Sequence, residues 1–175
     1  MLLSSSAYFI FLVAIFLLYW PLARVRALAL GVILLANYFF YAKWDLAYLL
    51  LIPAVSSLDF AIGLGLQDFK KPRVRRALVV ASIVMNIGLL AALRYAPGAT
   101  LALPLTLSFY VFQALTYTID LYRGDAQGTR SYLAHLAAVS FFPTTLAGPI
   151  TRVSSLIDQF EKRKALDPAD GSRAL

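Results

Sequence analysis

The side chains best suited to chemistry in this sequence are five polar residues that recur every three or four positions in one apolar stretch. They are Thr106, Tyr110, Gln113, Tyr117 and Asp120. Because such spacings return to the same side of an α-helix, we expect one polar face on an otherwise apolar helix. A hydroxyl, two phenols, an amide and a carboxylate are costly to expose to lipid. The face either lines a channel for a polar substrate or acyl donor, or forms hydrogen bonds to neighbouring helices, which is a common use of polar groups in membranes.

Further candidates follow that stretch. Arg123 extends the channel face, or pairs with Asp120 as a solvated pair at the helix end. Gly148 and Pro149 interrupt a later apolar run, which frees backbone groups to line a path or simply kinks the helix. Arg152 comes directly after this break, where it either meets a phosphate or carboxylate or anchors at the membrane surface.

Two ionisable residues lie alone inside apolar runs. A carboxylate at membrane depth, such as Asp59, is a functional hypothesis by default, but pairing with a cation or hydroxyl of a neighbouring helix is favoured. His135 is the only histidine, and we interpret it as a helix-packing residue rather than a catalyst. The chain has no cysteine, which excludes disulfides and a cysteine nucleophile, and one histidine cannot build a histidine-cluster metal site. We therefore assign no catalytic and no metal-binding residue.

The composition indicates that lipid surrounds these residues. Of the 175 residues, 61% are hydrophobic and only 14% are charged, whereas a soluble domain is about half apolar and a quarter charged. The formal net charge is +7. Because the cations lie in short loops between apolar runs, they indicate membrane orientation and contact with membrane lipids, and not nucleic-acid binding.

The apolar runs predict an all-α fold, a polytopic transmembrane helix bundle. A spanning helix needs about 20 mostly apolar residues. We expect one membrane domain, 1–151, and then a polar tail or loop, 152–175, leading to further C-terminal helices. The six predicted segments are 2–22, 27–42, 46–67, 77–93, 101–120 and 131–151.

Orientation follows from the basic loop at 70–76, in which we expect Pro72 to break any helix. If this loop is cytoplasmic, most other loop cations are cytoplasmic too and the N-terminus is outside. Strict alternation would then place the basic tail outside. A sixth segment that is broken or re-entrant, and does not cross the membrane, would remove this conflict.

Four blocks of the chain resemble signature segments of the membrane-bound O-acyltransferases, in particular the bacterial branch of alginate O-acetylation and D-alanyl transfer. These blocks are 37–45 (NYFFYAKWD), 103–113 (LPLTLSFYVFQ), 117–125 (YTIDLYRGD) and 139–150 (VSFFPTTLAGPI). The resemblance covers nearly the whole chain, as the N-terminal part of such a protein.

The resemblance implies a multi-pass protein of the bacterial inner membrane. It would transfer an acyl group, with acetyl favoured, onto a hydroxyl of an extracytoplasmic polysaccharide. The implied donor is acetyl-CoA or an acyl carrier protein, used as a substrate, with no bound cofactor. The implied partners are the remaining C-terminal acyltransferase helices and an extracytoplasmic acyl-transfer protein.

The family's catalytic histidine lies further downstream in a tryptophan-histidine context that this chain lacks, so we expect the chain alone to be incomplete as an enzyme. Two alternatives stay open. One is a non-catalytic scaffold subunit of an acylation complex. The other, which is less favoured, is a small transporter, since no internal repeat is visible.

Overall fold

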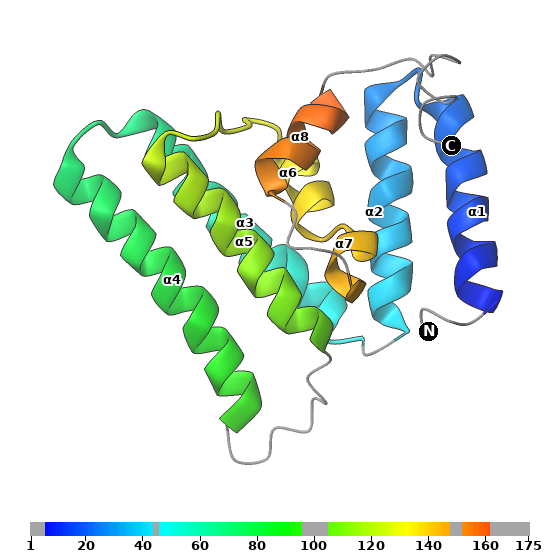
Figure 1. Cartoon of the computed structure of the whole chain (residues 1–175), viewed down its shortest axis with the longest axis horizontal. Helices are drawn as coiled ribbons and strands as arrows, with labels where there is room; N and C mark the ends of the chain where they lie inside the picture. Colours follow the sequence, from blue (N-terminus) through cyan, green and yellow to red (C-terminus); the bar gives the residue numbers. More distant parts are fainter. Residues whose placement is uncertain (1–5, 44–45, 96–104, 148–151, 162–175) are drawn as a thin grey trace.

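The structure is a computed structural model, which describes residues 6–43, 46–95, 105–147 and 152–161. Over these ranges the chain is helical and contains no strand, as predicted (Figure 1). The helices are α1 (Ser6–Leu22), α2 (Arg26–Ala42), α3 (Tyr48–Asp68), α4 (Pro72–Tyr95), α5 (Leu105–Arg123), α6 (Tyr132–Val139), α7 (Phe142–Ala147) and α8 (Val153–Glu161).

Helix α4 corrects the prediction for the basic loop. Pro72 does not break a helix there but begins one, so α4 starts five residues before the predicted 77–93 segment. Proline is tolerated at the first helical position because the N–H that it lacks would have no partner inside the helix. Arg75 therefore lies in the first turns of α4, where its guanidinium donates to the backbone carbonyls of Leu66, Leu121 and Tyr122. This arginine ties the ends of α3 and α5 to the start of α4.

The end of α5 is set by backbone geometry. Gly124 has a φ of +80°, a conformation that costs glycine little. The N–H of Gly124 donates to the carbonyl of Leu121, and the N–H of Asp125 donates to that of Asp120. This pair of bonds is the Schellman pattern that terminates helices.

The sixth segment is broken, as predicted, into α6 and α7 with Ser140 and Phe141 between them. The chain then returns to the end of the bundle from which it came. Thr129, before α6, donates its hydroxyl to Glu161 at the end of α8 at 2.7 Å. Glu161 also pairs with Arg26 at 3.0 Å. Residues 129–161 thus begin and end at the same end of the bundle.

Helix α8 also differs from the polar tail or loop predicted for 152–175. Its residues Val153, Leu156 and Ile157 are buried against the bundle, while its charged residues face outward. The stretch is polar overall, but its apolar residues recur at helical spacing and cover the core. Residues 162–175 lie outside the described part of the chain.

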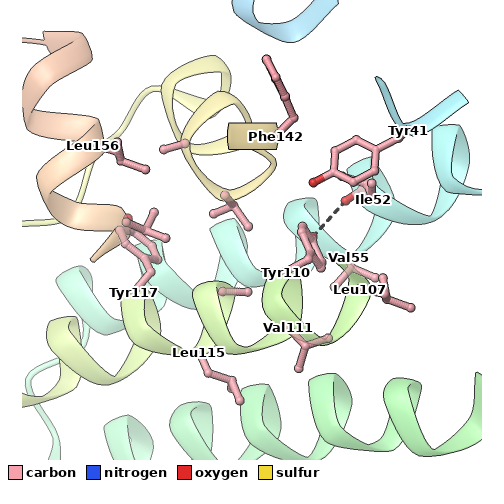
Figure 2. Close-up of a cluster of buried hydrophobic side chains, with 14 of the residues drawn as sticks. Tyr41, Ile52, Val55, Leu107, Tyr110, Val111, Leu115, Tyr117, Phe142 and Leu156 are labelled. Carbon is pink, nitrogen blue, oxygen red and sulfur yellow. Dashed lines mark hydrogen bonds between the residues drawn. The ribbon is translucent and has the colours of Figure 1, made fainter. Parts of the chain in front are cut away.

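The core is centred on α5, which contacts α3, α4, α6, α7 and α8. Figure 2 shows Tyr110 and Tyr117 on one side of this helix and Val111 and Leu115 on the other. The tyrosines face α3 and the broken segment, and the aliphatic side chains face α4. Helix α5 therefore positions the polar residues singled out in the sequence.

Two helices, α3 and α4, are long and apolar enough to cross a membrane by length and composition, and α1 and α2 are shorter apolar helices. Large apolar side chains are exposed along α1 and α4, among them Ile10, Leu17 and Val84. Apolar surface on this scale is what a membrane protein presents to lipid.

Candidate functional site

The predicted polar face of α5 exists, and it points into the bundle. Tyr110 and Tyr117 are 0% exposed, Gln113 is 3% exposed and Asp120 is 8% exposed. Thr106 lies in the first turn of α5, but its side chain is outside the described part of the structure. The polar face is therefore covered by other helices.

The centre of the site is the break between α6 and α7, where the helical hydrogen-bond ladder is interrupted. Gln113 of α5 donates its amide to the carbonyl of Ala138 at 3.2 Å and to the hydroxyl of Thr144 at 3.0 Å. The Thr144 hydroxyl also donates to the carbonyl of Phe141 at 2.9 Å. One side chain of α5 thus satisfies polar groups on both sides of the break.

Asn37 of α2 holds the opposite side of the same break. Its amide nitrogen donates to the carbonyl of Ala137 at 3.3 Å and to the hydroxyl of Ser140 at 3.0 Å. Its carbonyl oxygen accepts the backbone N–H of Phe142 at 3.1 Å. Asn37 is 1% exposed, so all of its polar atoms are committed to the broken segment.

Sequence reasoning did not single out Asn37 as a site residue. A signal was present, because Asn37 is the one amide inside the apolar run 27–42. An amide at that depth requires partners. Its partners, however, lie 100 and more residues away in the sequence, so the sequence could not name them.

The two buried tyrosines hold α5 to its neighbours. The Tyr110 hydroxyl lies 2.8 Å from the hydroxyl of Ser56 and donates to the carbonyl of Ile52 at 3.2 Å (Figure 2). The Tyr117 hydroxyl accepts the backbone N–H of Thr129 at 3.3 Å. The Tyr110 hydroxyl thus connects α5 to α3, and the Tyr117 hydroxyl connects α5 to the segment that precedes α6.

Asp59 forms a second buried polar cluster, between α3, α4 and α5. Its carboxylate accepts hydrogen bonds from Ser82 at 3.0 Å and from the amide of Asn86 at 2.9 Å. The Ser82 hydroxyl lies 3.2 Å from that of Thr118. All four side chains are 0% exposed. This geometry matches the favoured interpretation, a carboxylate paired with a cation or hydroxyl of a neighbouring helix, since Ser82 of α4 supplies the hydroxyl. It adds Asn86, which the sequence did not point to.

His135 packs inside the bundle. Its ring centroid lies 4.8 Å from that of Tyr117 and 5.5 Å from that of Phe60. The residue is 0% exposed, and among the described residues neither ring nitrogen has a hydrogen-bond partner of normal geometry. The contacts of this imidazole with described residues are therefore aromatic stacking contacts, which fits a packing role.

The chain is similar in sequence to several known bacterial proteins. The chain is 35% identical over 168 residues to the probable alginate O-acetylase AlgI of Pseudomonas fluorescens, a match that covers 93% of this chain and 34% of that protein. It is 33% identical over 186 residues to the protein of the same name from Azotobacter vinelandii, covering 93% of this chain and 36% of the relative.

Over 93% of its length the chain is thus similar to proteins of the membrane-bound O-acyltransferase family. A peptidoglycan O-acetyltransferase of Helicobacter pylori is also similar, at 23% identity over 170 residues, covering 75% of this chain and 32% of that protein. No protein-family model matches the sequence, and no solved structure matches it. The chain spans about a third of the length of the curated relatives that it matches.

The remaining candidate residues of the chain lie apart from the break. Arg123 pairs with Asp125 at 3.0 Å and is largely exposed, so the predicted pair with Asp120 is wrong. The Schellman turn places Asp125 beside the arginine, and the Asp120 carboxylate instead accepts the hydroxyl of Ser154 at 3.5 Å. Arg152 is exposed just before α8.

Two predictions are not tested by the described residues. Gly148 and Pro149 lie outside the described residues. A cavity of about 610 Å³ in the described part of the chain is lined by none of the candidate channel residues, so the channel stays a prediction. Within the same ranges, no group of three His, Cys, Asp or Glu side chains could hold a metal ion.

Proposed function

We propose that this chain forms the N-terminal, membrane-embedded part of an O-acyltransferase that transfers an acetyl group to a hydroxyl of an extracytoplasmic polysaccharide. The relatives named above are alginate and peptidoglycan O-acetylating proteins. The alginate relatives match 93% of this chain. The similarity therefore includes the residues that build the broken segment.

The observation that carries the proposal is the broken segment held by Asn37 and Gln113. Backbone that leaves the helical ladder at membrane depth is tolerated only where protein or a water-filled cavity covers it. Here two amides from α2 and α5 supply the missing partners. The sequence before and after the break, in 103–113 and 139–150, is where the chain resembles the family signatures. We infer that the break shapes one wall of the path by which the acyl group reaches its acceptor.

Transfer of an acyl group to a hydroxyl needs a base that removes the hydroxyl proton. The only histidine of this chain, His135, is packed between two aromatic rings and faces no other catalytic group among the described residues. We propose that the base comes from a part of the full-length protein outside these 175 residues. The present chain would then position helices and not perform the proton transfer.

Orientation and partners complete the proposal. Arg26, Arg75 and Arg130 lie at one end of the bundle, through contacts with Glu161, with α3 and α5, and with Asp68. The positive-inside rule makes this end cytoplasmic in the inner membrane and places the N-terminus outside. The donor, acetyl-CoA or an acyl carrier protein, would approach from this basic end, and an extracytoplasmic partner would take the acyl group at the other.

The test is acyl transfer from radiolabelled acetyl-CoA in membranes that contain this chain alone, or this chain with the remaining two-thirds of the Pseudomonas fluorescens relative. We expect label in polysaccharide only when both parts are present. Label from this chain alone, abolished by His135→Ala, would contradict the proposed external base. No label in either case, with both parts folded, would contradict the acyltransferase proposal and favour a non-catalytic scaffold.

A further inference from the structure

Helix α4 carries two arginines on a face that points away from the rest of the bundle. Arg73 and Arg76 are both exposed, and a spacing of three residues puts them on the same side of the helix. Arg75 lies between them in the sequence but points the opposite way, where it donates to carbonyls of α3 and α5. The inward contacts of Arg75 therefore fix the outward direction of the other two.

The same face of α4 continues as an apolar stripe toward the other end of the helix. Val80, Val84 and Ile87 are all exposed, and steps of four, four and three residues keep them in line with Arg76. At about 1.5 Å of rise per residue, Arg76 and Ile87 lie about 16 Å apart along α4. The hydrocarbon of one membrane leaflet is about as thick, at roughly 15 Å.

A shallow hollow of about 390 Å³ lies where the arginines meet the apolar stripe. It is lined by Pro72, Arg73, Arg76, Ala77 and Val80, and no carboxylate is among these lining residues. The carboxylate closest in the sequence, Asp68, pairs with Arg130 at 2.7 Å. The ion pairs that the described residues form use arginines other than the two in the hollow. The hollow thus combines two cations with apolar surface and offers no anion.

We propose that this face of α4 binds one anionic phospholipid from the leaflet at the basic end of the bundle. Its phosphate would lie between the guanidinium groups of Arg73 and Arg76, whose planar forks of N–H donors suit phosphate oxygens. One acyl chain would lie along Val80, Val84 and Ile87. A lipid matches both parts of the face, whereas a free phosphate ion would use only the arginines.

The charges of the surface favour a lipid with a net negative charge. Lys70 and Lys71, just before α4, are exposed as well, and cations gathered at a membrane surface attract anionic lipids. A zwitterionic head group would bring an ammonium into this positive field, with no carboxylate in the hollow to meet it. A protein helix packed on the face would have to bury Arg73 and Arg76, which is costly unless it brings carboxylates.

Quenching of a single tryptophan by brominated lipid tests the proposal. Val84→Trp, combined with Trp20→Phe and Trp44→Phe, leaves one tryptophan, on the exposed face of α4. The purified chain is placed in bilayers of phosphatidylcholine that contain a small fraction of brominated phosphatidylglycerol or, in parallel, of brominated phosphatidylcholine. At low salt we expect phosphatidylglycerol to be enriched beside this tryptophan about 25-fold, or about fivefold for each arginine.

A second reporter position separates this face from the rest of the lipid-facing surface. Ile10→Trp, in the same background, places the tryptophan on α1. Ile10 is exposed and lies as far from the basic end of its helix as Val84 does on α4. We expect little or no preference for phosphatidylglycerol at this position, because the described residues place no unpaired arginine pair on that face of α1.

Charge variants test the arginines themselves. Arg73→Gln with Arg76→Gln should remove most of the enrichment at the α4 reporter, whereas Lys70→Gln with Lys71→Gln, which removes the same charge outside the face, should leave most of it. Both arginines are exposed, so we expect the fold to survive, and circular dichroism checks this. Salt gives a measurement without any change in sequence. Raising it from about 0.1 M to about 1 M shortens the Debye length from about 10 Å to about 3 Å and should reduce the enrichment.

Four results would overturn the proposal. Equal enrichment at the α1 reporter would mean that anionic lipid gathers generally at the basic end. Equal losses in the lysine and arginine variants would mean that overall surface charge, and not the arginine pair, attracts the lipid. Displacement of the lipid by inorganic phosphate at matched ionic strength would mean a site for free anions. Loss of quenching by both lipids when the remaining two-thirds of the relative is supplied would mean that protein covers the face. None of these readouts depends on acyl transfer, so failure here is distinguishable from failure of the proposed function.

Discussion

Replacing Asn37 by leucine tests whether the break between α6 and α7 is held by side chains from other helices. Leucine has the γ-branched shape of asparagine, although it is larger, and it suits the apolar surroundings of α2, so the change removes the polar contacts while the site stays filled. The three hydrogen bonds lost connect Asn37 to Ala137, Ser140 and Phe142. In α6 and α7 themselves nothing is altered.

The expected loss of stability follows from the buried backbone groups that lose their hydrogen-bond partner. Phe142 is 2% exposed and Ala137 is 0% exposed, so the N–H of one and the carbonyl of the other lose a partner in a region closed to water. A buried polar group left without its partner costs about 1–3 kcal/mol. With the lost bond to Ser140 we expect destabilisation of about 3–5 kcal/mol, a large part of the about 5–15 kcal/mol typical of a folded domain.

The assay is unfolding of the purified chain in mixed micelles as denaturing detergent is increased, followed by circular dichroism. Hydrogen exchange of the amides at 140–147 gives the local effect, and we expect it to rise before the global transition. Leu35→Ala is the matched control, because Leu35 lies on the same helix and is 72% exposed. If Asn37→Leu cost no more than this control and left exchange at α7 unchanged, the account of the break would be refuted.

Three further predictions use the same bundle. Gln113→Leu should lower acyl transfer in the complemented enzyme more than Phe112→Leu, because Phe112 is exposed and Gln113 bonds both sides of the break; equal losses would count against that role. Gly63→Ala should destabilise by about 1–3 kcal/mol, since the added Cβ would lie 2.9 Å from a tyrosine ring of α5. Its control, Gly88→Ala, meets nothing within 4 Å and should stabilise by about 0.4–1 kcal/mol in the same detergent titration. His135→Ala should destabilise the chain by about 2–4 kcal/mol through the cavity that it leaves. Acyl transfer per folded molecule should be preserved. Loss of transfer at a normal yield of folded protein would contradict the packing role.

The local features of the sequence led to the right kind of fold for a simple reason. In lipid, a continuous apolar run has to satisfy its own backbone, so it becomes a helix whatever surrounds it. The same reasoning placed the polar residues of α5 on one face, because the helical period depends only on spacing. The break at the sixth segment was also visible, since proline cannot continue the ladder.

Two predictions were wrong because they rested on the overall polarity of a segment. The basic stretch at 70–76 looked like a loop, but Pro72 begins a helix there and Arg75 finds backbone acceptors on two other helices. The stretch after Arg152 looked like a polar tail, but its three apolar residues, spaced as one helical face, pack on the core. In both cases the partners come from other helices: backbone carbonyls accept from Arg75, and the core packs against the apolar face of α8.

The sequence by itself determined that the long apolar runs are helices, that the sixth run is broken and which face of α5 is polar. The tertiary structure decided what those polar groups contact. Asn37 reaches the break across 100 residues of chain, and Gln113 reaches it across 25. Such partners depend on how helices cross and in which direction a segment returns, and these depend on the packing of the whole bundle. For that reason the tertiary structure, and not the spacing of residues, showed that Thr129 and Glu161 lie at the same end of the bundle and that two amides hold the break between α6 and α7.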